Sequence, residues 1–122
     1  MTSAATARTD RPWGHFEDLR EEAGYKIKLI VVRPGHRLSL QRHRRRSEHW
    51  AVASGRADVE LDGRRLQLGP GESLDVPRLA WHRLGNSGTE DLVLLELQTG
   101  EYFGEDDIER REDDYGRAAP AP

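Results

Sequence analysis

Four side chains of the kinds that bind metal ions lie in two glycine-bounded stretches of the sequence, residues 35–55 and 71–86. They are Gln41, His43, Glu48 and His82. Two nitrogen and two oxygen donors suit one divalent cation, with zinc favoured and manganese, iron, cobalt or nickel also compatible. The chain has no cysteine, so thiolate ligands and disulfides are both excluded. The sequence therefore predicts a single metal site built from nitrogen and oxygen.

The spacing of the first two candidates indicates how one strand presents them together. Gln41 and His43 are two residues apart in the segment LSLQRH, and on a β-strand such residues point to the same face. Ser39 shares this face and is a candidate for binding substrate. A polar stripe that points into an otherwise apolar element requires a ligand, a water or a metal to satisfy it.

The elements that must position these residues are short and rich in Val, Ile and Leu. Apolar runs of four to eight residues alternate with Gly and Pro turns, including a tight hairpin at Asp62-Gly63, which is typical of an all-β sandwich or jelly roll. We expect residues 11–117 to form one domain, and residues 1–10 and 118–122 to be unstructured. A short helix is expected within the acidic segment 104–111.

Composition limits the classes of partner. The net charge of −3 argues against nucleic acid as a global partner. No stretch approaches the roughly 20 apolar residues that cross a bilayer, and the first residues lack the apolar core of a secretory signal. We therefore expect a cytoplasmic protein without a membrane partner. The apolar segment YKIKLIVV is an aggregation-prone strand if it lies at a sheet edge, which favours a homodimer.

The two stretches match the two motifs of the cupins. Gly35-x5-Gln41-x-His43-x4-Glu48-x6-Gly55 resembles the first, and residues 71–86 resemble the second, with Leu79 where glycine is usual. RPWG, SEHW, GEDDI and the final YGR further resemble the type II mannose-6-phosphate isomerase domain, often found fused behind a mannose-1-phosphate guanylyltransferase. This resemblance implies a cupin-type double-stranded β-helix, that is, a jelly-roll barrel.

The resemblance also implies an activity and site residues. The activity is a metal-dependent interconversion of mannose 6-phosphate and fructose 6-phosphate, which feeds GDP-mannose and polysaccharide precursors, and the implied metal ligands are Gln41, His43, Glu48 and His82. Arg46 resembles the family's active-site arginine, so we expect it to steady the enediolate or to grip phosphate.

Alternation along two other segments adds candidates. Lys28 is a candidate phosphate contact, and Glu96, which alternates with leucines, is the candidate catalytic base. Arg110, Tyr115 and Arg117 belong to the family-like tail, where they either close over the site or clamp the two chain ends together.

Two other functional classes compete with the isomerase. The first is a non-catalytic cupin that binds a sugar phosphate or sugar nucleotide, or that acts with a separate guanylyltransferase. The second is a metal oxygenase, which usually requires two or three histidines, so that Gln41 in place of a histidine weakens it. Because cupin folds carry many chemistries, the fold alone does not choose among these classes.

Overall fold

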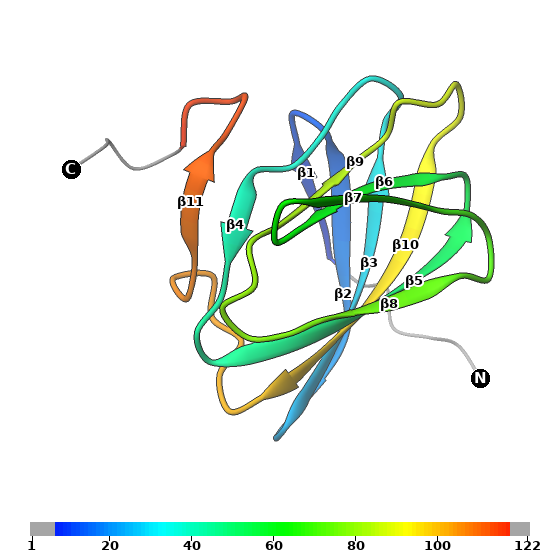
Figure 1. Cartoon of the computed structure of the whole chain (residues 1–122). Helices are drawn as coiled ribbons and strands as arrows, with labels where there is room; N and C mark the ends of the chain where they lie inside the picture. The colour runs from blue at the N-terminus through cyan, green and yellow to red at the C-terminus, as the bar shows by residue number, and fades with distance from the viewer. Residues whose placement is uncertain (1–6, 118–122) are drawn as a thin grey trace, which may run out of the picture.

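A computed structural model describes residues 7–117 as two antiparallel β-sheets (Figure 1). No helix within these residues is long and apolar enough to cross a membrane. The strands are β1 Arg8–Arg11, β2 Gly14–Glu22, β3 Tyr25–Val32, β4 Leu40–Arg42, β5 Arg46–Ser54, β6 Ala57–Leu61, β7 Arg64–Leu68, β8 Ser73–Val76, β9 His82–Gly85, β10 Leu92–Gly100 and β11 Glu109–Glu112. The all-β prediction is confirmed.

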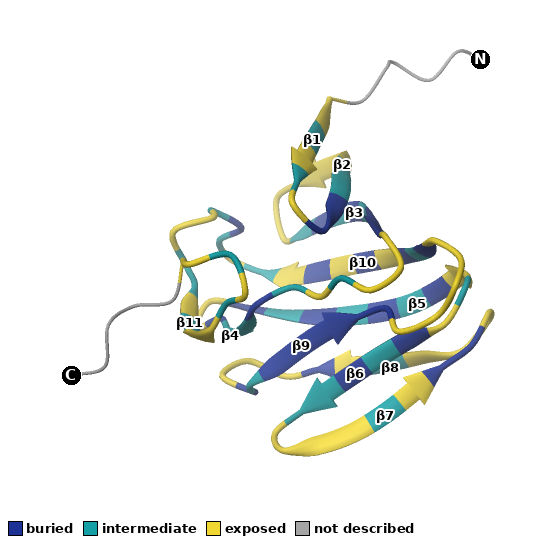
Figure 2. Ribbon diagram, turned by 90° about the horizontal axis from the view of Figure 1, so that it is seen from above, coloured by how far each residue is buried: buried dark blue, intermediate teal, exposed yellow. Residues whose placement is uncertain are grey.

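The two sheets are interleaved in sequence, as in a jelly roll. The six-stranded sheet has the order β1-β2-β3-β10-β5-β8, and the five-stranded sheet has the order β11-β4-β9-β6-β7. The inner positions of both sheets are buried (Figure 2). The hydrophobic core between them includes Trp50, Val52, Val59, Leu84 and Leu94. The space enclosed by the sheets is therefore where a buried site can form.

Strand β10 changes the polarity of its inner face halfway along. Leu92 and Leu94 are fully buried, but the next two inward side chains are Glu96 and Gln98, which are 5% and 0% exposed. Leu95 and Leu97 point outwards. Because residues i and i+2 share a face of a strand, the enclosed space is apolar at one end of β10 and polar at the other. The polar end is the part of the barrel that needs a ligand.

The predicted helix within residues 104–111 is wrong. The segment instead forms a turn and then strand β11, which pairs with β4. The carboxylate of Asp107 accepts hydrogen bonds from the backbone N–H groups of Arg44 and Arg45, and Glu109 pairs with Arg42. These long-range contacts outweigh the few hydrogen bonds that one helical turn would make, since short helices are marginal in water.

Two further expectations change. Strand β1 begins at Arg8, inside the segment 1–10 that we expected to be unstructured; residues 1–6 and 118–122 lie outside the described range. The segment YKIKLIVV is β3, which lies between β2 and β10 and is not a sheet edge. The edge-strand reason for a homodimer is therefore lost, although the homodimer itself stays a prediction.

The unusual Leu79 adopts the backbone conformation that a glycine would provide. Its φ is +67°, its side chain is half exposed, and its N–H donates to the carbonyl oxygen of His43. A left-handed conformation costs a non-glycine residue roughly 1–2 kcal/mol. The sequence departure from the cupin motif thus introduces local strain beside a candidate metal ligand.

We expect Leu79→Gly to unfold at a higher temperature than Leu79→Ala. Both variants lose the exposed leucyl side chain, but only glycine relieves the left-handed strain, which should favour it by about 1 kcal/mol. Thermal and urea unfolding of the two variants check this expectation. Equal stability of the pair would show that this turn is not strained.

Candidate metal centre

Three of the four predicted metal ligands converge in the structure. His43, Glu48 and His82 are all buried, and one ligand atom from each lies within 4.8 Å of the others. The Nε2 of His43 is 3.3 Å from Glu48 Oε2, and the Nε2 of His82 is 3.9 Å from Glu48 Oε1. These residues come from the end of β4, from β5 and from β9, so both sheets contribute to the cluster.

Both imidazoles are held in one orientation by the backbone. His43 Nδ1 is 2.7 Å from the carbonyl oxygen of Asp107, and His82 Nδ1 is 2.9 Å from that of Ala80. A carbonyl oxygen only accepts, so each Nδ1 carries the proton and each Nε2 keeps its lone pair. Arg46 donates to His43 Nε2 at 3.2 Å, which requires the same tautomer. This is the tautomer that a histidine uses to bind metal through Nε2.

Both histidines are uncharged near neutral pH. Burial, together with the nearby guanidinium of Arg46, lowers the pKa of His43 to about 4. Burial also lowers the pKa of His82. A metal ion therefore has no proton to displace from either Nε2 atom, and metal binding does not compete with protonation until the solution becomes acidic.

Glu48 lies at the centre of the cluster. Its Oε2 accepts from Arg46 Nε at 2.9 Å, and its Oε1 accepts from the indole N–H of Trp50, also at 2.9 Å. Arg46, Glu48 and Trp50 are alternate residues of β5, so they share its inner face. The carboxylate is thereby oriented toward both histidines before any cation binds.

Gln41, the fourth predicted ligand, lines the same cavity. Cross-strand pairing places it opposite His82 on β9. Its Nε2 donates to Ser39 Oγ at 2.9 Å, which engages the amide nitrogen and leaves the oxygen as the donor for a cation. Ser39 itself is fully buried and does not line the cavity. The Ser39 hydroxyl orients Gln41, and we therefore do not assign Ser39 to substrate binding.

Glu96 enters the cavity from β10, next to the cluster. Trp50 Nε1 donates to Glu96 Oε1 at 3.0 Å as well as to Glu48, and Gln98 Nε2 donates to Glu96 Oε2 at 2.7 Å. Burial and the neighbouring carboxylate of Glu48 raise the pKa of Glu96 to about 7. Glu96 is therefore a carboxyl group that can exchange a proton near neutrality, as a general base must.

Lys28 borders the same cavity, although its charge already has partners. It faces Glu96 across the β3–β10 pair, and its Nζ donates to Glu105 at 3.2 Å. The ammonium also lies 4.3 Å from the centre of the Phe16 ring, a cation–π contact. Lys28 lies on the inner face of β3, where it is 6% exposed.

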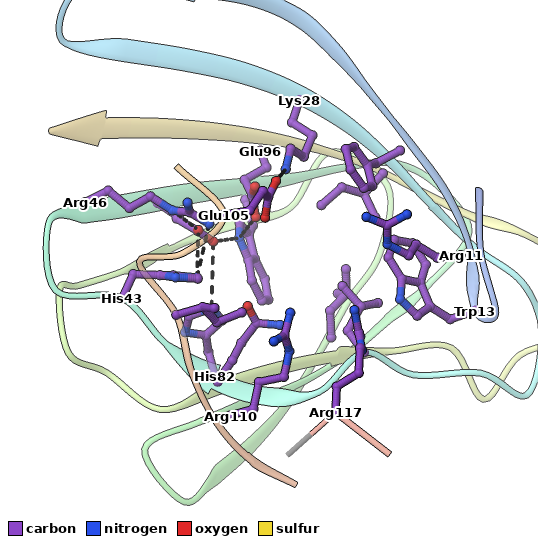
Figure 3. Close-up of a pocket in the computed structure, with 18 residues that line it drawn as sticks. Arg11, Trp13, Lys28, His43, Arg46, His82, Glu96, Glu105, Arg110 and Arg117 are labelled. Carbon is purple, nitrogen blue, oxygen red and sulfur yellow. Dashed lines mark hydrogen bonds and ion pairs between the residues drawn. The ribbon is translucent and has the colours of Figure 1, made fainter. Parts of the chain in front are cut away.

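The rest of the cavity wall contains residues that sequence reasoning left without a role or assigned to the tail. Figure 3 shows Arg11 and Trp13 across the cavity from the histidines, with Arg110 and Arg117 on the side between them. Arg11 and Trp13 come from the β1–β2 corner, within the RPWG motif, and the other two come from β11 and the segment after it. The cavity has a volume of about 140 Å³.

The donor set fits a divalent metal ion. It combines two neutral imidazoles, each with its other nitrogen already bonded, one carboxylate and one amide oxygen, all on the lining of one cavity. Nitrogen and oxygen donors of this kind suit zinc, manganese, iron, cobalt or nickel. The carboxylate of Glu48 supplies the negative charge that a buried cation requires.

Comparison with known families gives a match over almost the whole chain. A family model described as "Mannose-6-phosphate isomerase C-terminal" matches residues 2–113. This match includes all four candidate ligands, together with Arg46, Glu96 and Arg110.

Curated relatives are similar over most of this chain. The alginate biosynthesis protein AlgA of Pseudomonas aeruginosa is 47% identical over 109 residues, covering 89% of this chain and 23% of that protein. The mannose-1-phosphate guanylyltransferase ManC of Salmonella typhimurium is 44% identical over 107 residues, covering 88% and 22%. The chain thus spans less than a quarter of the length of these two relatives.

The fold also matches solved structures. An uncharacterized conserved protein with a double-stranded beta-helix domain from Klebsiella pneumoniae subsp. pneumoniae superposes with a TM-score of 0.70 at 19% identity. The match covers 80% of this chain and 83% of that one. Together with the two interleaved sheets, this confirms the predicted double-stranded β-helix.

We expect Glu48→Gln to lose divalent metal binding. The amide keeps the shape of the side chain but removes the charge at the centre of the cluster, so affinity for zinc or manganese should fall at least ten-fold. A metal at 100 times its Kd stabilises a protein by about 2.7 kcal/mol, so metal should raise the unfolding temperature of the parent protein and not that of the variant. Glu90→Gln, on an exposed loop, is the control. Equal metal affinity in all three proteins would contradict the site.

We expect Asp107→Asn to weaken the support of His43 and to reduce acid sensitivity. Burial opposes ionisation of Asp107, but hydrogen bonds from the N–H groups of Arg44 and Arg45 outweigh it and lower its pKa below 3.8. This carboxylate therefore stabilises the fold above the unfolded-state pKa, and its contribution disappears as pH falls through the folded value. The variant should be about 1 kcal/mol less stable at pH 7, with the two stabilities converging as the pH falls through the folded-state pKa of Asp107. Urea unfolding across pH tests both parts, and a constant difference would refute this role.

Proposed function

The chain belongs to the mannose-6-phosphate isomerase C-terminal family, and we propose that it is a metal-dependent isomerase of mannose 6-phosphate and fructose 6-phosphate. One observation carries the proposal. A carboxyl group with a pKa near neutrality, Glu96, shares an indole hydrogen bond with Glu48, which is in turn in contact with both histidines. A proton carrier and a metal-binding cluster therefore border one cavity.

The reaction needs these two groups at adjacent positions. In the open-chain aldose, a base removes the proton from C2, and the electron pair forms a C1–C2 double bond as negative charge develops on oxygen. The proton is then delivered to C1 and the proton of the C2 hydroxyl moves to O1, which leaves a carbonyl at C2. We assign the proton transfer between C2 and C1 to Glu96. This residue borders the cavity, and a pKa near neutrality lets its carboxyl group both accept and release a proton.

The developing oxygen charge has a separate set of partners. A divalent ion held by Gln41, His43, Glu48 and His82 would supply Lewis-acid stabilisation of that charge. Arg46 adds a fixed positive charge beside the same cluster, since its Nε bonds Glu48. We assign Arg46 to orienting the Glu48 carboxylate and to stabilising the enediolate.

A binding module without turnover is the competing function. The matched region is less than a quarter of each of these two relatives, so the activity of a whole relative does not follow from the match. A cupin that binds a sugar phosphate for a separate guanylyltransferase would keep the cluster but would not need Glu96 as a proton carrier. Turnover and its dependence on Glu96 therefore separate the two functions.

We expect metal-loaded protein to form fructose 6-phosphate from mannose 6-phosphate. Glu96→Gln should lower kcat by about 10²-fold or more, while zinc or manganese affinity stays within a few-fold of the parent because Glu96 is outside the ligand cluster. A coupled assay of fructose 6-phosphate, with calorimetry of metal binding, measures both quantities. Sugar-phosphate binding without turnover under any divalent metal would overturn the isomerase and favour the binding module.

A further inference from the structure

The part of the cavity wall next to the metal cluster has unbalanced positive charge. Five basic side chains line the cavity: Arg11, Lys28, Arg46, Arg110 and Arg117. Three acidic ones line it: Glu48, Glu96 and Glu105. Arg46 pairs with Glu48 and Lys28 pairs with Glu105. Glu96 bonds Trp50 and Gln98 and pairs with none of the other three arginines.

Arg110 is the least satisfied of these arginines. Its Nε is buried without a hydrogen-bond partner, and within residues 7–117 its guanidinium makes no ion pair. Burial and the positive charges of Arg117 and Arg11 lower its pKa. Arg117 uses its Nε to bind Asp113, and Arg11 donates one terminal nitrogen to the carbonyl oxygen of Asp10. Both keep further N–H groups for another acceptor.

A second buried donor without a partner borders the same wall. Trp13 is 4% exposed, and its indole N–H has no hydrogen-bond partner. A buried polar group without a partner costs free energy, so native structures satisfy nearly all of them. The donors of Trp13 and Arg110 both lie on the lining of one cavity, together with two further arginines (Figure 3). An acceptor with several oxygens and negative charge would satisfy them.

The register of the sheet places Arg110 beside the metal cluster, on the side away from His82. Arg110 pairs with Gln41 across β11 and β4, and Gln41 pairs with His82 across β4 and β9. Because neighbouring strands are about 4.8 Å apart, the backbone of Arg110 is roughly 5 Å from that of Gln41, the candidate amide ligand, and roughly 10 Å from that of His82. In a hexose 6-phosphate, the phosphate lies at the end of the carbon chain opposite C1 and C2, where the isomerisation occurs.

We propose that Arg110, with Arg117, Arg11 and the Trp13 indole, forms an anion subsite that binds the phosphoryl group of the sugar phosphate. The identification of the ligand as this sugar phosphate rests on the proposed function. The inference that the subsite binds an anion does not. Guanidinium groups bind phosphate oxygens through paired hydrogen bonds. Lys28, the phosphate contact expected from sequence, already has Glu105 as its partner, and is left to contact the sugar hydroxyls.

The test uses inorganic phosphate and metal-free protein, so that neither turnover nor a metal contributes. Phosphate should raise the unfolding temperature of the parent protein, and calorimetry should give its Kd. Arg110→Gln should weaken phosphate binding at least ten-fold. Without phosphate this variant should be at least as stable as the parent, because the replaced side chain makes no bond and is repelled by its neighbours. Arg117→Gln, which changes a more exposed arginine of the same subsite, should also weaken phosphate binding.

Arg64→Gln is the matched control, since it removes the same charge from an exposed position on the β6–β7 hairpin. Unchanged phosphate affinity in Arg110→Gln, an equal loss in Arg64→Gln, or no phosphate binding by the parent protein would overturn the subsite. Phosphate binding that depends on Arg110 in a protein without isomerase turnover would support the subsite and would overturn only the isomerase. In an active protein, Arg110→Gln should raise KM for mannose 6-phosphate at least ten-fold.

Discussion

The buried carboxylate of Glu48 is the constraint around which this barrel is arranged. An ionised carboxylate removed from water must have charged or hydrogen-bonding partners. Arg46 and Trp50 provide them from the same strand, and the two histidines approach from the other sheet. These contacts join side chains of the two sheets, so the site also contributes to how the sheets pack.

The same constraint explains the division of the barrel interior. Toward one end of β10 the inner residues are leucines and the neighbouring strands add valine and tryptophan, which form an ordinary apolar core. Toward the other end Glu96 and Gln98 replace the leucines, and Lys28 faces Glu96 across the sheet. Stability arises mainly from the first half, because burial of apolar surface is the dominant favourable term in folding. The second half is preorganised for a ligand at some cost in stability.

Sequence reasoning predicted the parts of this arrangement that depend on local periodicity. Alternation placed Gln41 and His43 on one face and made Glu96 a candidate for the same cavity, because residues i and i+2 share a strand face whatever the fold. It could not place Arg11 and Trp13 at the cavity, and Arg110 was a candidate only through the family-like tail, because β1 and β11 border the cavity through long-range pairing. The mistaken helix has the same origin, since the partners of Asp107 lie 62 and 63 residues earlier in the chain. Such contacts leave no periodic signal.

The two walls of the cavity are carried by different classes of strand. The metal cluster is on β5, β9 and the end of β4, which are inner strands of their sheets, whereas Arg11 and Arg110 are on β1 and β11, each the outermost strand of its sheet. An outermost strand has only one neighbour to accommodate when its side chains change. Mutation and selection can therefore alter the ligand that such a barrel accepts while the side chains of its candidate metal cluster are inherited unchanged.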